Sequence, residues 1–523
     1  MRHEGMDHIP RSYCITRDES VTSDREGSPM GRRGLRLITL AAVPVLVLSA
    51  CGGTGATQTA TSGAGASSVP SASNITPSQS AAPAGATKVV WFIGLGAGSQ
   101  PAQLQAETDF VNNYNNTNKD NIFLQVSIIP NTNATDTLKT QIAAGKGPDI
   151  IGPVGIQGRA GFPGVFLDLT AEVASNKTDL APYGDKLVNA MKMGKDGLIG
   201  LPYALYPGFI FYNKDLFAAQ TLPNLPTTVG AQYNGADWTW DALGKLAKQL
   251  TIDTAGKKST DAGFNAAKTK QYGFDTQWIN DLRRFATPFG AGNYVGADGK
   301  TAQIPDAWSQ AWKWYYDAMW TSHFAPNNAE RSAADMANAT TVGTGRVAME
   351  LVWTWSISSY GSVDAAGKST SKFKAWDMGV LPSNGGVTTD PVDVDTFTIL
   401  KASKNPDAAY KAMLAMEADP GLAVAYGAMP AIAAQQAAYF TSAQAGVTAQ
   451  FPGNTVTWTV ASEMLKYAAS PTHQDPFPNY VKGTTDDQAF YTKLQSTGGL
   501  NMDTEIAAFK ATLQKDFDSA AAS

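Results

Sequence analysis

The strongest constraint on the fold is the alternation, from Lys88 onward, of short apolar runs with longer amphipathic segments. Residues 89–93 and 122–129 are apolar runs of strand length. Other segments, such as 239–250 and 405–416, carry apolar residues at the i, i+3, i+4, i+7 spacing of one helix face. Strands that alternate with helices predict an α/β architecture, in which helices cover the faces of largely parallel sheets.

Length and composition set further limits. The chain has 523 residues, and the part beyond Cys51 is long enough for two lobes, because a single core stops growing at about 250 to 300 residues. The net charge of −5 argues against nucleic acid as a partner. Only His323 and His473 lie beyond Cys51, so we expect no histidine-rich metal site. Cys51 and Cys14 are the two cysteines, which predicts that the mature chain has no internal disulfide.

The N-terminal part has the features of a lipoprotein signal peptide. Residues 37–50 are apolar, come after Arg32, Arg33 and Arg36, and end in Leu-Ser-Ala directly before Cys51. This run is too short to span about 30 Å of hydrocarbon at 1.5 Å per residue. We therefore predict that residues 1–50 are leader and signal peptide. Acylation of Cys51 would then hold the protein on the extracellular face of the cell membrane, with no other membrane contact.

Two points about export stay open on the sequence alone. Met1 or Met30 is the true start, since residues 1–29 have no apolar periodicity. Export takes either the Sec or the twin-arginine route, because Arg32-Arg33 only loosely matches the latter. Residues 51–87 are rich in Gly, Ala, Ser, Thr and Pro and contain no charged residue before Lys88, which predicts a flexible tether.

A glycine-rich turn comes after the first predicted strand. Gly94-Leu95-Gly96-Ala97-Gly98 lies where a dinucleotide fingerprint would lie, but its last glycine comes one residue too early for GxGxxG. We interpret it as a strand-to-helix turn that allows a ligand or the facing lobe to approach closely. No cofactor is predicted.

Six short segments stand in a recognisable order along the chain. They are 143–150 (AAGKGPDI), 166–170 (FLDLT), 197–203 with 211–217 (GLIGLPY and FYNKDLF), 238–241 (WTWD), 345–349 (GRVAM) and 403–409 (SKNPDAA). In this order they resemble segments of the extracellular solute-binding proteins of ABC importers. That group includes maltose-binding protein and many oligosaccharide-binding lipoproteins. The resemblance covers nearly everything from Lys88 to Phe517.

The resemblance implies a two-lobe, type II periplasmic-binding-protein-like fold with a ligand cleft between the lobes. The chain would cross between lobes near residues 202–206, 392–396 and 446–451. The expected lobes are 88–204 plus 396–446 for lobe 1 and 205–395 plus 447–523 for lobe 2.

The resemblance also implies a function. The protein would capture a sugar, in particular an oligosaccharide, and deliver it to the permease subunits of an ABC transporter, acting as a monomer and not as an enzyme. The alternatives are an exported glycoside hydrolase or a binder of a non-sugar solute. A hydrolase needs two carboxylates about 5 to 10 Å apart, and no motif in the sequence marks such a pair.

A sugar site needs aromatic plates for the C–H face of the ring and planar polar side chains for its hydroxyls. The aromatic residues of 308–319 fall on one helix face and are expected to pack in the core. Trp355, after the GRVAM segment, is the first candidate for ligand contact, with Trp353 at a position where the family commonly has Gly. Tyr206 and Phe209 come after the first crossing, and Tyr206 fits ligand contact and core equally well.

Polar contacts are expected from the first turn, from the segment after Pro148-Asp149 and from the second crossing. The candidates are Gly96, Ser99, Gln100, Gln157, Arg159, Asp393 and Asp395. Asp149 itself is expected to brace its own strand. Asp393 and Asp395 alternate with Val392 and Val394 and so project to one face, either toward the ligand or as solvated edge charges.

Overall fold

A computed structural model describes residues 76–521, apart from 78, 99, 194–196, 277–278, 280, 339 and 362–369. The side chains of residues 101, 102, 156, 157 and 521 are also outside this description. The predicted signal peptide and Cys51 therefore lie outside the described residues. Within the described part of the chain, no helix combines the length and the apolar character needed to cross a membrane.

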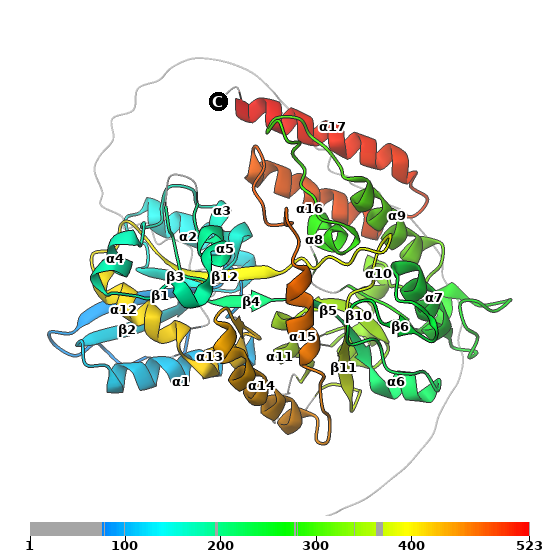
Figure 1. Ribbon diagram of the computed structural model, residues 1–523, viewed down its shortest axis with the longest axis horizontal. Helices are drawn as coiled ribbons and strands as arrows, with labels where there is room; N and C mark the ends of the chain where they lie inside the picture. Colours follow the sequence, from blue (N-terminus) through cyan, green and yellow to red (C-terminus); the bar gives the residue numbers. More distant parts are fainter. Residues whose placement is uncertain are drawn as a thin grey trace, which may run out of the picture. The chain divides into compact units, whose positions relative to one another are not determined.

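Two main sheets organise the described chain (Figure 1). The larger has six strands in the order β13-β4-β12-β3-β1-β2, and the smaller has three in the order β10-β5-β11. Strand β1 is parallel to β2 and β3, whereas β12 is antiparallel to both β3 and β4. The strands of the larger sheet are β1 (Thr87–Ile93), β2 (Ile122–Ile128), β3 (Ile150–Val154), β4 (Ala204–Tyr206), β12 (Asp393–Ile399) and β13 (Met429–Pro430). Those of the smaller are β5 (Gly208–Asn213), β10 (Met349–Trp353) and β11 (Trp376–Gly379).

Helices cover both faces of the larger sheet, which explains its apolar strands. In β1, Trp91 packs edge-on against Phe110 of α1, while the adjacent Phe92 belongs to a second apolar cluster with Leu138 of α2. The helices around this sheet are α1 (Pro101–Thr117), α2 (Asn131–Ala143), α3 (Ile156–Ala160), α4 (Thr170–Ser175), α5 (Asp185–Ala190), α12 (Pro406–Glu417), α13 (Pro420–Ala425) and α14 (Gln436–Gln450).

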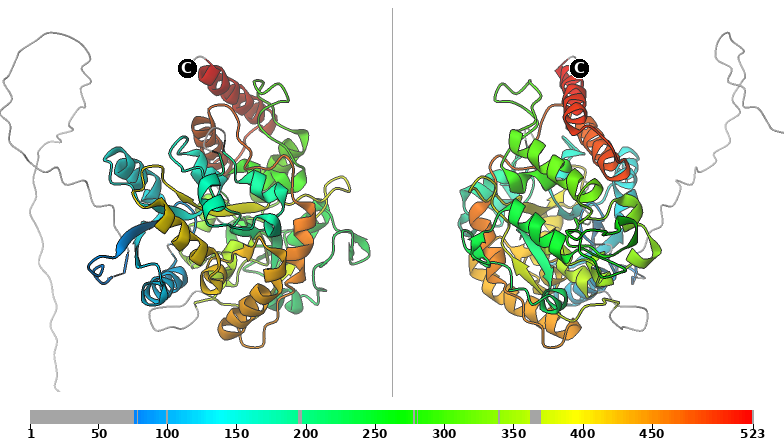
Figure 2. Two further views of the ribbon diagram at one scale, coloured as in Figure 1. Left: turned by 60° about the vertical axis from the view of Figure 1, so that its left-hand side comes forward. Right: turned by 90° about the vertical axis from the view of Figure 1, so that its right-hand side faces the viewer.

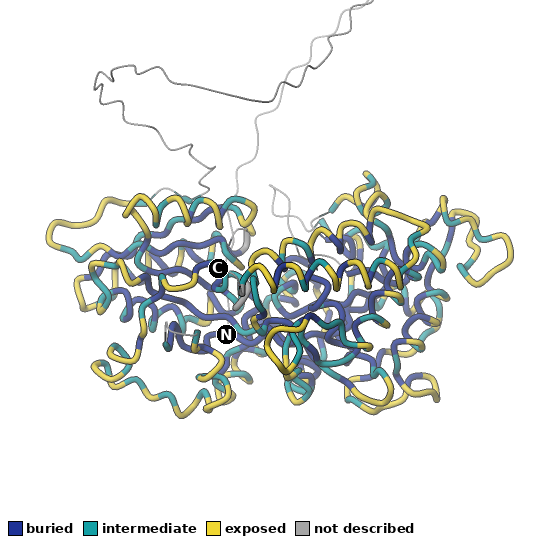
Figure 3. The backbone as a smooth tube through the Cα atoms, turned by 90° about the horizontal axis from the view of Figure 1, so that it is seen from above, coloured by how far each residue is buried: buried dark blue, intermediate teal, exposed yellow. Residues whose placement is uncertain are grey.

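The smaller sheet lies among the remaining helices, and α16 and α17 pack against each other at the top of the molecule in the views of Figure 2, with α16 also in contact with α8 and α9. Figure 3 shows buried backbone inside both halves and exposed positions on the outer helices and loops. These helices are α6 (Lys214–Ala219), α7 (Trp240–Leu250), α8 (Leu282–Ala286), α9 (Asp306–Trp320), α10 (Asn328–Arg331), α11 (Ile357–Tyr360), α15 (Thr459–Met464), α16 (Tyr480–Ser496) and α17 (Met502–Ala521). Two short hairpins, β6 (Gln232–Tyr233) with β7 (Ala236–Asp237) and β8 (Ile252–Asp253) with β9 (Thr269–Gln271), complete the strands.

Strands β4 and β12 form the link between the two sheets, and we call this pair the crossing ribbon. β4 belongs to the larger sheet and passes within two residues into β5 of the smaller one. In the ribbon, Asp393 pairs with Tyr206, Val394 with Leu205, and Asp395 with Ala204. Two of the three predicted crossings, near 202–206 and 392–396, fall on this ribbon, and the third, near 446–451, falls at the end of α14. The lobe boundaries inferred from the resemblance remain a proposal.

Several local predictions are confirmed. Thr239 caps α7, because its side chain accepts a hydrogen bond from the N–H of Ala242 at 3.1 Å. Helix α12 begins at Pro406 as expected, since proline tolerates the first helical position. Trp308 and Trp312 of α9 are fully buried in the core.

Two residues of the predicted tether, Thr76 and Gln79, make hydrogen bonds with the larger sheet, while the extent of the tether stays a prediction. The Gln79 side chain donates to the carbonyl of Val126 and accepts from its N–H, both at 2.8 Å. The N–H of Ile128 donates to Thr76 Oγ1 at 2.7 Å. Strand β2 is the edge of its sheet, and these side chains satisfy backbone groups that would otherwise be unpaired. A composition rich in small polar residues does not reveal such contacts.

Candidate functional site

The two faces of the crossing ribbon differ in chemistry. Because paired residues share a face and neighbours alternate, Tyr206, Asp393 and Asp395 lie on one face, and Leu205 and Val394 lie on the other. The first face is polar, and all three of its side chains are buried. This arrangement answers the open question about Asp393 and Asp395, which are not solvated edge charges.

Asp393 is held by groups from the half of the molecule that contains the smaller sheet. Arg284 of α8 approaches its carboxylate at 3.2 Å, His473 Nε2 lies 2.8 Å from Oδ1, and Gln474 Nε2 donates to Oδ1 at 2.9 Å. Burial raises the pKa of Asp393, but Arg284 and His473 outweigh burial and bring the pKa below its ordinary value. Asp393 is therefore ionised at neutral pH and joins the ribbon to α8 and to the segment before α16.

Asp395 lies two residues further along and behaves differently. Burial, assisted by repulsion from Asp393, raises the pKa of Asp395 to about 7, although Arg159 and Arg284 oppose this. Arg159 is itself buried, and burial lowers the pKa of its guanidinium to about 10. Its Nη1 donates to Met191 Sδ at 3.5 Å, whereas Nε and Nη2 have no partner among the described residues. Such buried, unsatisfied donors are uncommon and suit an external acceptor.

The predicted aromatic residues fall into different environments. Phe209 is fully buried in β5, opposite Val352 of β10, and reaches no surface, so we do not include it in the site. Tyr206 is also buried, and its hydroxyl has no partner among the described residues. Trp353 is fully buried, donates from Nε1 to the carbonyl of Pro391 at 2.8 Å, and has the Arg284 guanidinium 5.6 Å from its ring centre. Trp355 is half-buried and stacks parallel to Trp353, with ring centroids 6.1 Å apart.

Two glycines of the turn at 94–98 are required by contacts with residues of the same half of the molecule. A Cβ at Gly94 would overlap the carbonyl oxygen of Ile129, and one at Gly98 would overlap Ile93, so both glycines are required by local contacts. Gly96 is exposed, and its Cβ position lies 3.9 Å from Asp395 Oδ2. Gln100 is exposed at the start of α1, where its N–H donates to Gln103 at 3.1 Å.

Three polar residues named in the sequence analysis remain. Ser99 and the side chain of Gln157 lie outside the described residues. Asp149 braces strands, as expected, because it accepts from the N–H of Val90 at 2.8 Å and from Ser403 Oγ at 2.6 Å.

A cavity of about 660 Å³ lies against the apolar face of the ribbon, and we call it the junction cavity. Leu205, Val392 and Val394 form its floor, and residues of α3, α5 and segment 465–480 form its walls. Arg159 is the single predicted residue among those that line it, and Gln474 and Tyr480 line it from the other half. The volume falls within the range of about 300 to 1,000 Å³ that is typical of small-molecule sites. Trp355 does not line this cavity.

Sequence reasoning missed Arg284, Gln474 and Tyr480, and it noted His473 only as a scarce residue type. For Arg284, the sequence does contain a pattern that indicates its role. Arg283 and Arg284 interrupt an apolar stretch that includes Leu282, Phe285 and Phe289, and consecutive arginines in such a stretch indicate buried ion pairs. Tyr480 carries no comparable signal, because its role depends on the path of the chain before α16.

Two α/β halves, a ribbon that crosses between them and a cavity at their junction define the class of two-lobe binding proteins. The model of one family, bacterial extracellular solute-binding protein, matches residues 97–421, and the chain belongs to this family. The fold and the family inferred from the six sequence segments are confirmed. No curated protein matches the chain.

Several solved structures have a similar fold. An ABC substrate-binding protein from Listeria monocytogenes in complex with cycloalternan is 20% identical, with a TM-score of 0.61 over 82% of this chain and 98% of that chain. A sugar transporter from Rhizobium etli in an open conformation is 17% identical, with a TM-score of 0.60 over 82% and 99%. A cyclic α-maltosyl-1,6-maltose binding protein from Arthrobacter globiformis is 15% identical, with a TM-score of 0.56 over 83% and 100%.

Proposed function

We propose that this protein is a lipid-anchored, extracellular substrate-binding protein that captures a neutral oligosaccharide and passes it to the permease of an ABC importer. Three observations support the proposal. The chain belongs to a family of extracellular solute-binding proteins, similar folds hold oligosaccharides such as cycloalternan, and the sequence before Cys51 has the features of a lipoprotein signal. The proposal includes no catalytic step.

The observation that carries the proposal is Arg159 on the wall of the junction cavity. Its Nε and Nη2 are buried donors without partners among the described residues, and a sugar presents several hydroxyl acceptors. The same cavity offers the Tyr480 ring as a plate and the Gln474 amide as a planar polar group. An aromatic face beside planar polar side chains is what a pyranose ring requires.

The cavity also explains how binding would close the protein. Arg159 belongs to the half that contains the larger sheet, whereas Gln474 and Tyr480 belong to the other half. A ligand shifts a conformational equilibrium only by its difference in affinity for the two states. A sugar that contacts both walls at once binds the closed arrangement better than the open one, and so favours closure.

Calorimetric titration with a panel of neutral oligosaccharides tests the proposal. We expect one sugar class to bind, and we expect Arg159→Met to weaken its binding at least tenfold. Lys186→Met is the matched control, because Lys186 lines the same cavity but is exposed to solvent. If no sugar in the panel binds, or if both variants bind equally well, the proposed site is wrong.

Hydrolysis is tested on the same samples. The contrast between the ionised Asp393 and Asp395, with a pKa near 7, resembles the acid and base pair of a glycoside hydrolase. Asp393, however, is already engaged by Arg284, His473 and Gln474, which leaves it poorly placed to act on a substrate. We expect the oligosaccharide to be recovered intact after prolonged incubation. Steady release of smaller sugars would instead identify a hydrolase.

A further inference from the structure

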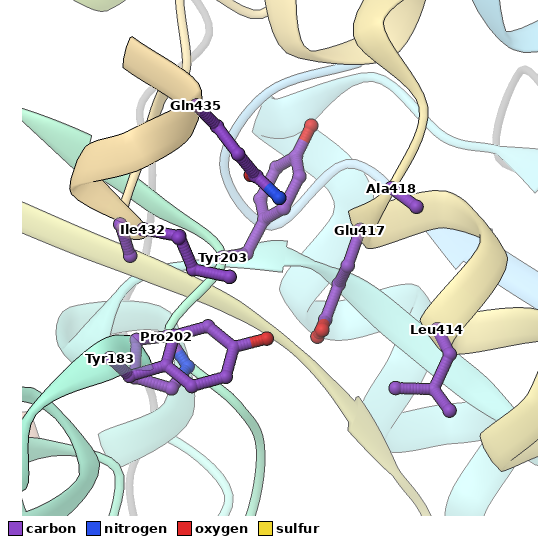
Figure 4. A pocket seen from close by; sticks show the side chains of 9 residues that line it. Tyr183, Pro202, Tyr203, Leu414, Glu417, Ala418, Ile432 and Gln435 are labelled. Atoms are coloured by element: carbon purple, nitrogen blue, oxygen red, sulfur yellow. The ribbon is translucent and has the colours of Figure 1, made fainter. Parts of the chain in front are cut away.

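A second, smaller pocket lies beside the larger sheet, away from the junction cavity. It has a volume of about 100 Å³ and no lining residue in common with that cavity. We call it the Glu417 pocket, since Glu417, the last residue of α12, reaches into it (Figure 4). The other lining residues are Tyr183, Pro202, Tyr203, Leu414, Ala418, Ala431, Ile432 and Gln435. Ala418 and Gln435 are exposed and mark the opening to solvent.

The Glu417 carboxylate has no partner among the described residues. Both of its oxygens are buried, and neither makes a hydrogen bond there. Figure 4 shows the Tyr183 hydroxyl pointing toward this carboxylate from the opposite wall, with the Tyr203 ring above them beside the Gln435 side chain. The Tyr203 hydroxyl is also buried and makes no hydrogen bond with a described residue. A buried carboxylate without a hydrogen bond is costly, so the pocket contains an unmet requirement for a donor.

The surroundings of the pocket favour a cation. Burial alone raises the pKa of Glu417 well above its ordinary value, and no basic residue of the described chain counteracts it. The pKa of Tyr203 is likewise raised, first by burial and then by Asp419 and Glu417. The titratable residues that line the pocket are Glu417, Tyr183 and Tyr203, and the charged or titratable groups that act on the two tyrosines from nearby are Tyr410, Asp419, Tyr439 and Asp395, all of them acids. A positive charge would meet no like charge from these groups.

The lining also restricts the kind of cation. The described residues contain no group of three or more His, Cys, Asp or Glu arranged to hold a metal ion, and one carboxylate is too few ligands for a divalent cation. By contrast, Leu414, Ile432 and the Tyr203 ring provide an apolar wall beside a single carboxylate. An ammonium group on a short apolar chain matches this combination, because tyrosine faces attract cations and the methylene groups contact the apolar wall.

We propose that the Glu417 pocket binds a small primary organic ammonium, whose nitrogen pairs with the Glu417 carboxylate and contacts the Tyr183 hydroxyl. The ammonium has three donors, enough for both carboxylate oxygens and one hydroxyl. The site is independent of the oligosaccharide site. Tyr203 connects it to the crossing ribbon, since its N–H donates to the carbonyl of Asp395 at 3.0 Å.

Calorimetric titration of the purified protein with ethylammonium chloride tests the proposal, with ethanol as the uncharged molecule of similar size. We expect saturable binding of ethylammonium and none of ethanol. Glu417→Gln should weaken ethylammonium binding at least tenfold, and Tyr183→Phe should weaken it severalfold. Asp407→Asn, an exposed carboxylate at the start of the same helix, is the control and should leave binding unchanged.

Proton uptake and release provide a second readout that needs no variant. Burial raises the pKa of Glu417, whereas a paired ammonium would lower it again, so binding should release protons and become stronger as the pH rises. Should Glu417→Gln fail to fold, this pH dependence decides the question.

Several results would overturn the proposal. The first is the absence of ethylammonium binding. The second is equal binding of ethanol, which would show that the pocket does not recognise the positive charge. The third is ethylammonium binding that neither Glu417→Gln nor pH alters. The oligosaccharide titration should give the same affinity in Glu417→Gln as in the unmodified protein. Loss of ammonium binding alone therefore leaves the proposed sugar function untouched, and failure of sugar binding leaves the ammonium site untouched.

Discussion

Asp393 and Asp395 show how the surroundings of a residue set its charge. They project from the same face of β12, yet only Asp393 has a guanidinium, an imidazole and an amide within reach. Burial and repulsion from Asp393 raise the pKa of Asp395. Attraction to Arg159 lowers this pKa, but by less than burial raises it. The sequence predicts their shared face but not this difference, because the groups that decide it come from residues 159, 284 and 473.

Asp395 should make the stability of the protein depend on pH. With a folded-state pKa of about 7, Asp395 keeps its proton in the native state between about pH 4 and 7, where the unfolded chain releases it. Its contribution to the free energy of unfolding is therefore complete below about pH 4 and is lost as the pH rises toward 7. Asp395→Asn should match the unmodified protein at pH 4 and exceed it at pH 8 by about 2 to 4 kcal/mol in urea unfolding.

The control for this experiment is Asp237→Asn, an exposed carboxyl on β7. It should leave the pH dependence unchanged. A parallel shift of Asp395→Asn at both pH values would mean that Asp395 acts through packing and not through its proton.

Trp355 remains a sequence-based prediction for sugar contact, and it is half-buried on the outer side of Trp353. If it stacks on the ligand, Trp355→Ala should weaken oligosaccharide binding by about 1 to 3 kcal/mol, the scale of burying one large apolar side chain. Calorimetry measures the affinity, and thermal unfolding shows whether the fold survives. Trp320→Ala, another half-buried tryptophan, is the control on α9. If Trp355→Ala binds the oligosaccharide with unchanged affinity, Trp355 is not part of the sugar site, and the proposed site consists of the junction cavity alone.

At the scale of elements, the end of α13 positions the turn that carries Trp355. Gly427 has a left-handed φ of +62°, and the N–H groups of Gly427 and Ala428 donate to the carbonyls of Val424 and Ala423. This pattern is a Schellman motif, for which glycine is the preferred residue. A Cβ at Gly427 would also overlap the carbonyl oxygen of Thr354. The α13 end and the Trp355 turn are therefore in direct contact.

Gly427→Ala should lower the free energy of unfolding by more than the backbone strain of a positive φ would lower it, because the new Cβ also overlaps the Thr354 carbonyl oxygen. Gly453→Ala is the matched control, because Gly453 also has a positive φ, +84°, but nothing lies within 4 Å of its Cβ position. We expect the control to lose about 1 kcal/mol and Gly427→Ala a further 1 to 3 kcal/mol. Denaturant unfolding measures both. Equal losses would show that the contact with Thr354 adjusts without cost.

The helices could be predicted from the sequence more readily than the contacts between distant segments. The spacing in 239–250 and the Asn-Pro pair at 405–406 are local signals, and α7 and α12 form where these signals predict them. The attachment of Thr76 and Gln79 to β2 was not predictable, because a side chain that pairs with a distant backbone leaves no periodicity. The same reason applies to the Glu417 pocket, whose walls come from segments 183–203 and 414–435.

For the molecule as a whole, the lipid anchor is a prediction from the sequence, since Cys51 lies outside the described residues. Cys51→Ser should block acylation and signal cleavage, because the thiol is the group that is modified. The expected result is an unprocessed precursor of higher mass, measured by mass spectrometry of membrane and soluble fractions. Cys14→Ser changes the other cysteine and should leave mass and partitioning unaltered. A processed, membrane-bound Cys51→Ser protein would rule out this anchor.

The pairing of β3 with β12 has a consequence for how the chain is made. Ile151 and Thr398, which are joined by a hydrogen bond, are 247 residues apart. At about 5 to 20 residues per second, the ribosome needs roughly 10 to 50 s to add the partner of β3 after β3 itself. During that time one edge of β3 is unpaired, and contacts between such distant segments form slowly. The larger sheet therefore closes late in synthesis or after export, and a chain cut before residue 393 would expose an edge on which strands of other chains can pair.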